Sequence, residues 1–508
     1  QQGKVKQALA LLNRCVTKYP QSEEAHNYYG LALERTGSLQ EAATEFHKAV
    51  NLNPNDPEAA YNLGAALSLL GDYSGAVRNL EIAVRLRGDF PDAERELGRA
   101  LVKTGDLVGA IGAIRNAVRQ RPNSTGEHIE LGRLYAQIGD KPEALVQFRE
   151  AIAADPASVE AHTDLGVTLR KGGDLEGSAA EFRRAVSIDP DSIWSLKNLA
   201  QALEDQGELK AAVDCYRRVV VLQATSGDAH ANLGQALKAE DKLTDAIGEL
   251  KKAVQLSPQS ARAHFLLAEA LAQAGDSGAA LSEYKKAARL DPENAEFHLE
   301  LGRALSNDQP EDAIAELKRS IDLGPNNSAA HRILGILLRR TGDRRGAASE
   351  FQKASQLALA AERRLDADVH IRTAKQYLKE NHGPRAIDEL RLALTAEPDS
   401  PDANLLLGVA LSEGGEWSEA NQAFTAAAQK SPADPDIHFN FGVFLGRRGD
   451  FQGAARQLRS VLSLRPGYPQ AHCLLASALA HIGDTAGADM ELNLARDLGQ
   501  CGAEPAQQ

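Results

Sequence analysis

The sequence predicts an all-α solenoid, a linear array of antiparallel helix hairpins, and three observations predict it. Glycines recur at a fixed interval of 34 residues at positions Gly30, Gly64, Gly98, Gly132 and Gly166. Between them, apolar residues recur at the spacing of one helix face. The composition is rich in Ala and Leu, with only 5% aromatic residues and one Met, and it favours helices. A chain of this kind grows by stacking equal units rather than by enlarging a single core.

Each unit contains two helices joined by a tight turn. Leu97 and Leu101 mark the apolar face of one first helix, and Ile114 and Ala117 mark the face of the second helix that follows. A glycine at the turn and a proline after the second helix end the two segments. These residues keep the same interval of 34: Gly37, Gly71, Gly105, Gly139 and Gly173 at the turns, and Pro122, Pro156 and Pro190 after the second helices.

Fourteen full units follow from this pattern, preceded by a half unit. The half unit covers residues 1–22 and matches only a second helix. One hairpin cannot bury its apolar face alone, so each unit needs its neighbours. The units start at Glu23, Pro57, Pro91, Thr125, Val159, Ile193, Gly227, Ala261, Ala295, Ser328, Ala367, Pro401, Pro435 and Pro469.

The repeated motif resembles the tetratricopeptide repeat family. The resemblance rests on segments such as AHNYYGLALERTG (25–37), AYNLGAALSLLG (60–71) and AHTDLGVTLRKGG (161–173), and it covers nearly the whole chain. It implies a right-handed superhelix whose first helices line an inner groove. It also implies a protein that binds other proteins rather than one that catalyses a reaction.

The expected organisation follows the units. We expect the half unit at 1–22, ten units over 23–361, an insertion or extended helix at 362–366, four units over 367–502 and a flexible tail at 503–508. The tenth unit runs on through an Ala-rich stretch, so we expect an extended second helix there. Residues 355–366 are then either a hinge or a change of superhelical phase.

Composition and motifs narrow the function. A formal net charge of −13 argues against a nucleic-acid binder. The four cysteines are isolated, and no run of about 18 apolar residues predicts a membrane span. The sequence has no P-loop, no G-x-S-x-G and no H-E-x-x-H motif. We therefore expect no enzyme activity, no cofactor and no metal. We also expect no nucleic acid among the partners and no membrane-spanning segment.

Histidine is the most frequent candidate ligand, because ten of the thirteen occupy the fourth place of a unit. Equivalent places in stacked helices lie about 10 Å apart, whereas zinc needs ligands at about 2 Å. The resemblance implies an aromatic residue that packs between helices at this place, so we expect a structural role. The ten are His26, His128, His162, His230, His264, His298, His331, His370, His438 and His472.

The resemblance also implies which places of the first helix face the groove. The fifth and ninth places carry seven basic residues but only one acid, Glu269, in a chain of net charge −13. We interpret them as a basic stripe that reads acidic or phosphorylated peptides. The alternative is ion pairing with acids of the neighbouring unit. The seven are Arg95, Arg99, Arg133, Lys197, Arg303, Arg332 and Lys375.

Apolar and amide residues at groove places are further candidates. Phe265 with Leu299, and Leu405 with Phe439, are candidate apolar pockets, and packing between repeats is the alternative. The superhelix of O-GlcNAc transferase-type proteins carries an asparagine ladder at the sixth place, and the repeat region is partly similar to it. Asparagine can bond an extended peptide backbone through both its donor and its acceptor. The ladder is partial here, at Asn62, Asn198, Asn232 and Asn440.

Three functional hypotheses remain open. The first is a scaffold that binds extended peptide segments of other proteins in the groove, acidic segments among them. The second is the substrate-recruiting arm of a larger enzyme or secretion machine, since the chain begins at Gln1 within a repeat and we expect it to be part of something longer. The third is self-association through uncapped ends, since solenoids need polar caps.

Overall fold

The computed structural model describes residues 2–497, with the backbone alone for residues 2–6. The tail expected at 503–508 lies outside the described residues. The described chain contains 28 α-helices and no strand. It divides into two compact units, which we call unit 1 (residues 1–168 and 431–508) and unit 2 (residues 169–430). The boundary at residue 168 falls inside α10 (Val159–Lys171).

Unit 1 contains thirteen helices besides the first part of α10. They are α1 (Gln2–Lys18), α2 (Glu23–Arg35), α3 (Leu39–Leu52), α4 (Pro57–Leu69), α5 (Tyr73–Leu86), α6 (Pro91–Thr104), α7 (Leu107–Gln120), α8 (Thr125–Ile138), α9 (Lys141–Ala154), α25 (Pro435–Arg447), α26 (Phe451–Leu464), α27 (Pro469–His481) and α28 (Thr485–Asp497).

Unit 2 contains fourteen helices besides the last part of α10. They are α11 (Leu175–Ile188), α12 (Ile193–Asp205), α13 (Leu209–Leu222), α14 (Gly227–Ala239), α15 (Leu243–Leu256), α16 (Ala261–Gln273), α17 (Ser277–Leu290), α18 (Ala295–Leu305), α19 (Pro310–Leu323), α20 (Ser328–Arg340), α21 (Arg344–Lys379), α22 (Gly383–Ala396), α23 (Pro401–Glu413) and α24 (Trp417–Lys430).

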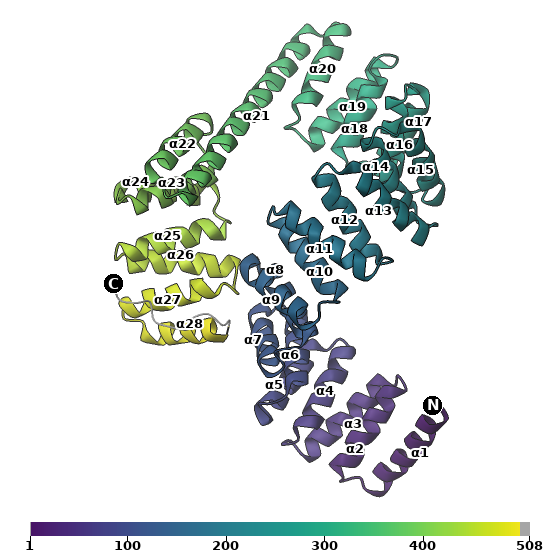
Figure 1. Cartoon of the computed structure of the whole chain (residues 1–508), viewed down its shortest axis with the longest axis vertical. Coiled ribbons are helices and arrows are strands. Elements are labelled where there is room, and N and C mark those ends of the chain that lie inside the picture. The colour runs from purple at the N-terminus through teal and green to yellow at the C-terminus, as the bar shows by residue number, and fades with distance from the viewer. Residues whose placement is uncertain (1, 498–508) are drawn as a thin grey trace. The chain divides into compact units, whose positions relative to one another are not determined.

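The helices pack in chain order. From α12 to α21 each helix contacts the next one along the chain, both within a hairpin and between successive hairpins, as Figure 1 shows for α14 to α19. This arrangement confirms the prediction of an all-α solenoid of helix hairpins. Among the described residues, none of the helices is both long and apolar enough to cross a membrane.

A Gly-Asp pair builds most of the hairpin turns. Gly71 adopts φ +84°, in the left-handed region that glycine tolerates, and ends the first helix. Asp72 follows and accepts a hydrogen bond from the backbone N–H of Gly75 at 2.9 Å, which caps the second helix. Two turns place another residue at the left-handed position, Asp241 at φ 64° and Asn381 at φ 58°.

The glycine within the first helix permits close contact with the second helix. A Cβ atom built on Gly234 would lie 2.5 Å from Cγ of Leu250, and one on Gly64 would lie 2.7 Å from Cγ of Leu80. Both leucines are fully buried. The 34-residue glycine period therefore reflects the crossing of two helices, in which a side chain at that place would overlap its partner.

Helix α21 departs from the hairpin pattern. It runs for 36 residues without interruption, so that the second helix of the tenth repeat continues into the first helix of the eleventh. Figure 1 shows α20 beside one end of α21 and α22 beside the other. Between these contacts, residues 358–366 are exposed on every side, including Leu359 and Leu365. The middle of α21 is therefore a single helix without packing partners.

Candidate functional site

The histidines at the fourth place of the repeats are structural links. In eight of them Nδ1 lies 2.5 to 2.9 Å from a side-chain oxygen of Glu or Gln on the second helix of the same repeat. Nε2 lies 2.7 to 3.2 Å from a backbone carbonyl oxygen at the end of the preceding repeat. The eight are His26, His128, His230, His264, His298, His331, His438 and His472.

Both ring nitrogens of these histidines are engaged, so neither is available to a metal. The described residues contain no group of three or more His, Cys, Asp or Glu side chains that could hold a metal ion. Histidine at this place instead joins two repeats through polar contacts, and it is buried in nearly every case. The sequence predicted a structural role, and the structure supplies the partners.

A groove runs along the first helices of unit 2, and we call it the first-helix groove. Its first part is a cavity of about 280 Å³ lined by Arg170, Trp194, Lys197, Asn198, Gln201, Glu204, Tyr216, Asn232, Gln235 and Arg262. Its second part, of about 650 Å³, shares Gln235 and Arg262 and continues to Phe265, Leu266, Glu269 and Phe297. The two cavities adjoin at Gln235 and Arg262, and together their linings include residues of α12, α14, α16 and α18.

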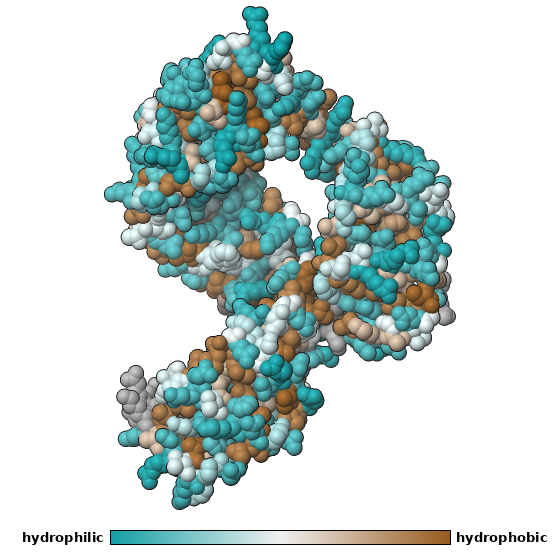
Figure 2. All heavy atoms as spheres, turned by 180° about the vertical axis from the view of Figure 1, so that it is seen from behind, coloured by the Kyte–Doolittle hydropathy of each residue, from teal (hydrophilic) through white to brown (hydrophobic). Residues whose placement is uncertain are grey.

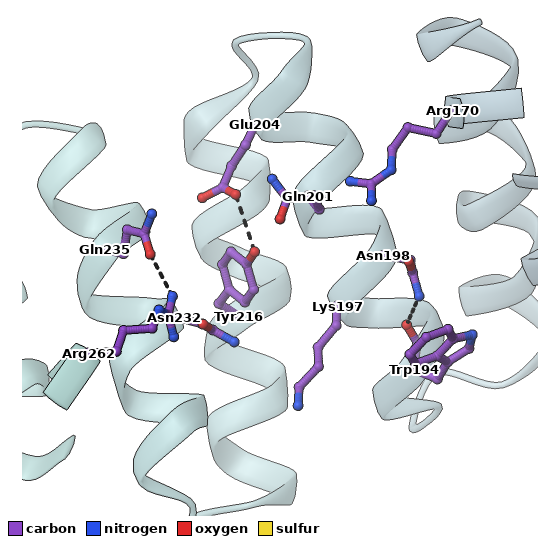
Figure 3. A pocket seen from close by; sticks show the side chains of 10 residues that line it. All are labelled: Arg170, Trp194, Lys197, Asn198, Gln201, Glu204, Tyr216, Asn232, Gln235 and Arg262. Carbon is purple, nitrogen blue, oxygen red and sulfur yellow. Dashed lines mark hydrogen bonds between the residues drawn. The ribbon is translucent and has the colours of Figure 1, made fainter. Parts of the chain in front are cut away.

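Positive charge prevails in the first part of the groove. Lys197 is half-buried and has no hydrogen-bond or ion-pair partner within the described chain. In Figure 3 its side chain extends with Asn232 and Arg262 on one side and Trp194 on the other. Arg262 donates a hydrogen bond of 2.7 Å to the neutral amide of Gln235. Two cations therefore face this space without a carboxylate partner.

The lining of this cavity includes one carboxylate, Glu204, which is half-buried. Tyr216 donates a hydrogen bond of 3.3 Å to its Oε2. Burial raises the pKa of Glu204 above its ordinary value, against the opposing effect of the Tyr216 hydrogen bond. Burial and the nearby Glu204 raise the pKa of Tyr216. The positive charge of Arg262 acts in the opposite direction and lowers the pKa of both groups, so Arg262 lies within electrostatic range of Glu204 without forming an ion pair with it.

The second part of the groove has an apolar floor. The Phe265 ring lies 4.6 Å from the Phe297 ring and 5.8 Å from the Tyr284 ring, centroid to centroid. Phe265 is only 6% exposed and belongs to a core cluster that includes Leu266 and Leu299. Phe265 and Leu299 thus pack between repeats, as the alternative interpretation has it, and Phe265 also lines the groove.

The arginines at the fifth and ninth places of unit 1 form an ion-pair ladder with acids of the same and the next repeat. Arg95 contacts Asp92 at 3.2 Å and the buried Glu127 at 3.3 Å. Each contact between repeats joins a first helix to the first helix that follows. The remaining contacts are Arg99 with Glu96 at 2.8 Å and with Glu130, and Arg133 with Glu160 at 2.7 Å and Asp164 at 2.6 Å.

The ladder changes the interpretation of the basic stripe. The three arginines come from two adjacent repeats: Arg95 and Arg99 from one, and Arg133 from the next. Each already has carboxylate partners. Most of the acids from the next repeat stand at its third and sixth places, rather than at the second place. A ligand acid would have to displace them, which makes Lys197 the better candidate for an acidic group.

The remaining predicted residues are dispersed. Arg303 pairs with Glu300 at 3.3 Å, while Arg332 and Lys375 are exposed on α20 and α21. Asn62 donates a hydrogen bond of 2.9 Å to Asn27 of the preceding repeat. The Asn198 and Asn440 amides donate to carbonyl oxygens of their own helices, and Phe439 stacks on Tyr468 at 4.9 Å. Lys197, Asn198, Asn232 and Phe265 are therefore the predicted residues that the first-helix groove brings together.

Several groove residues escaped the sequence analysis. Trp194 and Arg262 occupy second places of their repeats, and Gln201 and Gln235 occupy ninth places. These places were expected to face the groove, but the pattern of charge drew attention to basic and apolar residues. Trp194 could have been identified from the sequence, because it is an aromatic residue at a place where most repeats carry an acidic residue. It is 62% exposed, which is unusual for a residue of its size.

The outer surface of the described chain is mixed. Figure 2 shows hydrophilic residues over most of one face, with hydrophobic residues scattered among them. Single exposed apolar side chains of this kind are common on protein surfaces. The first-helix groove is a concave feature in which charged, amide and aromatic side chains converge.

Comparison with known proteins agrees with the repeat pattern. One family model, described as tetratricopeptide repeat, matches residues 1–60, 61–125, 129–193, 197–261, 231–295, 371–435 and 444–495. A second model with the same description matches residues 271–337. No curated protein matches the chain.

Solved structures give likenesses in fold. YrrB, described as a TPR protein with an unusual peptide-binding site, is 24% identical over 36% of this chain and 95% of its own, with a TM-score of 0.34. PilF of Pseudomonas aeruginosa is 22% identical over 41% of this chain and 94% of its own, with a TM-score of 0.36. A thermophilic TPR protein of Thermus thermophilus is 25% identical over 36% of this chain and 99% of its own, with a TM-score of 0.29.

Proposed function

The chain belongs to the tetratricopeptide repeat family, and from this premise we propose that it is a scaffold that binds extended segments of other proteins in the first-helix groove. The observation that carries the proposal is the pair of adjoining cavities lined by residues of α12, α14, α16 and α18. Its walls present charged, amide and aromatic side chains from successive repeats. An extended segment that lies along such a groove can contact each repeat in turn.

The amide side chains suit a peptide backbone. Asn232 and Gln201 have no hydrogen-bond partner among the residues the structure describes, and both line the groove. The amide of Asn198 donates to the carbonyl of Trp194 at 2.9 Å, which leaves its oxygen free to accept. Each amide offers a donor, an acceptor or both to the main chain of a ligand. The scaffold would thus bind a segment mainly through its backbone, without a specific contact to every side chain.

The ligand segment is acidic in this proposal. The chain as a whole carries a net charge of −13, yet Lys197 and Arg262 face the groove without carboxylate partners. Arg332 and Lys375 are exposed on α20 and α21 and do not line this groove. Binding requires no reaction, and the scaffold needs no cofactor or metal for it.

Site-specific photocrosslinking tests this function. A photoreactive amino acid replaces Gln201 in the groove, and in a matched protein it replaces Lys251, an exposed residue on the second helix α15. We expect crosslinks to short segments of partner proteins at position 201 alone, and their loss in the Lys197→Glu, Asn232→Ala double variant. The matched charge reversal Lys251→Glu leaves them unchanged. Equal crosslinking at positions 201 and 251 would overturn the proposed function.

A further inference from the structure

We infer that the first-helix groove recognises a bipartite segment, with an anionic side chain at one end and an aromatic or large aliphatic side chain about six residues away. This inference rests on the proposed function, because it names the ligand of the same groove. It follows from the order of the side chains: Lys197 lies on α12, the amides Asn232 and Gln235 on α14 and Phe265 on α16, where Arg262 lines both parts of the groove.

The anionic end belongs at Lys197. Its amine has no partner in the described chain, and Arg262 opposite it bonds only the neutral Gln235. Arg170 lines the same cavity, and its Nη1 lies 3.5 Å from Oδ2 of Asp205. This contact is long, so the guanidinium could also contact an anion of the ligand. Carboxylate and phosphate share this chemistry, because both accept hydrogen bonds from ammonium and guanidinium groups.

The apolar end belongs over Phe265. The second part of the groove has its floor at Phe265, Leu266 and Phe297, with Ala239 and Ala261 at its sides. The cavity has a volume of about 650 Å³, and its lining also includes the ion pair of Lys238 and Glu269. An aromatic or aliphatic side chain placed there would bury apolar surface against rings that the core holds in position.

The spacing follows from the repeat. Neighbouring helices pack about 10 Å apart, so Lys197 on α12 and Phe265 on α16, two repeats along, are separated by roughly 20 Å. An extended chain advances about 3.3 Å per residue, which corresponds to about six residues. Asn232 and Gln235 of α14 lie between the two ends and would bond the main chain of the intervening residues.

Trp194 makes the inference measurable. It is 62% exposed and lines the cavity beside Lys197. The chain has two tryptophans, so the Trp417→Phe variant leaves Trp194 as a single fluorescent reporter. The probes are synthetic twelve-residue peptides of Gly and Ser that carry one Glu or one phosphoserine and one Phe, in both orders, at separations from two to nine residues.

We expect the tightest binding at a separation of about six, with at least a tenfold loss of affinity at a separation of two. Lys197→Glu should weaken the Glu and phosphoserine peptides by at least tenfold and leave a Phe-only peptide unchanged. Lys251→Glu is the matched charge control. Comparison of the Glu and phosphoserine series identifies which anion the groove prefers.

Two results would overturn the inference in different ways. Affinity that is independent of separation, or unchanged by Lys197→Glu, would refute the bipartite motif while crosslinking at position 201 still supports the scaffold. Failure of every peptide together with equal crosslinking at positions 201 and 251 would refute both the motif and the scaffold.

Discussion

Nδ1 of His26 lies 2.6 Å from Oε2 of Glu45, and Nε2 of the same ring lies 3.2 Å from the carbonyl oxygen of Pro20. The imidazole ring thus bridges a carboxylate oxygen and a backbone carbonyl oxygen. The pair joins the end of one repeat to the second helix of the next. Because stacked repeats gain stability from their interfaces, this small motif contributes each time it recurs.

The first prediction concerns acid stability. Burial alone would raise the pKa of Glu45, Glu249 and Glu283, but hydrogen bonds from a lysine and from the histidine hold each pKa below the ordinary value of 4.5. A carboxyl group whose folded pKa is depressed contributes stability above its unfolded pKa and loses it as the pH falls through the folded pKa. We expect the thermal midpoint, followed by circular dichroism, to fall as the pH drops below about 4.5.

Natural glutamines supply the control for this prediction. His128 and His438 contact Gln147 and Gln457 at the place where the other repeats carry Glu. The Glu249→Gln, Glu283→Gln double variant should lose less stability on acidification than the parent, and Gln147→Glu should lose more. An identical pH profile in all three proteins would show that these carboxylates do not set the acid response.

The second prediction concerns the histidine itself. His264→Leu removes the hydrogen bonds to Oε2 of Glu283 and to the carbonyl of Pro258, while Oε1 of Glu283 still accepts from Lys286. A buried group left unsatisfied costs about 1–3 kcal/mol. We expect faster amide hydrogen exchange in α16 and α17 and a lower midpoint in urea. His370→Leu should cost less, because the His370 side chain is 25% exposed, against 5% for His264. Equal losses of stability in the two variants would mean that burial of the histidine does not determine the strength of its hydrogen bonds.

The third prediction compares two glycines that lie in neighbouring helices. Gly234→Ala places a Cβ atom 2.5 Å from Cγ of Leu250, so we expect a destabilisation of about 1–3 kcal/mol from overpacking. Gly248 lies within α15 with nothing near its Cβ direction. Gly248→Ala should therefore stabilise the chain by up to about 1 kcal/mol through helix propensity. Urea unfolding of both variants measures the two opposite signs.

The fourth prediction concerns α21. Its middle has no packing partner, and helical hydrogen bonds without tertiary support open readily. Hydrogen exchange should be faster at residues 358–366 than in the ends of α21 that contact α20 and α22. Residues 263–271 of α16, which are almost all buried, serve as the slow reference. Uniform protection along α21 would argue against local opening, and so against the proposal that this segment is a hinge.

Much of the fold could be predicted because it follows from local sterics. Gly30 and Gly37 recur with the period because a helix crossing excludes a side chain and a tight turn needs a left-handed residue. The fourth-place histidines were predicted to be structural from their spacing and from the aromatic residue that the family resemblance implies at this place. Their partners were not predicted, because Glu45 is 19 residues from His26 and reaches it only when the turn between α2 and α3 has closed.

The candidate site was harder to predict from residue types. A basic residue at the fifth or ninth place has the same appearance in sequence whether it is paired, like Arg133, or free, like Lys197. The difference depends on whether the next repeat presents an acid such as Asp164 within reach. It also depends on side-chain conformations that no local pattern encodes.

Because α21 is continuous, insertions and deletions within it change the orientation of the repeats that follow it relative to those that precede it. Each residue of an α-helix turns the chain by about 100° and advances it by about 1.5 Å. One residue added between 358 and 366 would rotate α22 to α24 by about a quarter turn relative to α20, whereas an addition of seven would nearly restore their direction. Elsewhere a hairpin loop can absorb an added residue, so sequence relatives of this chain should vary in length at their loops and in whole turns here.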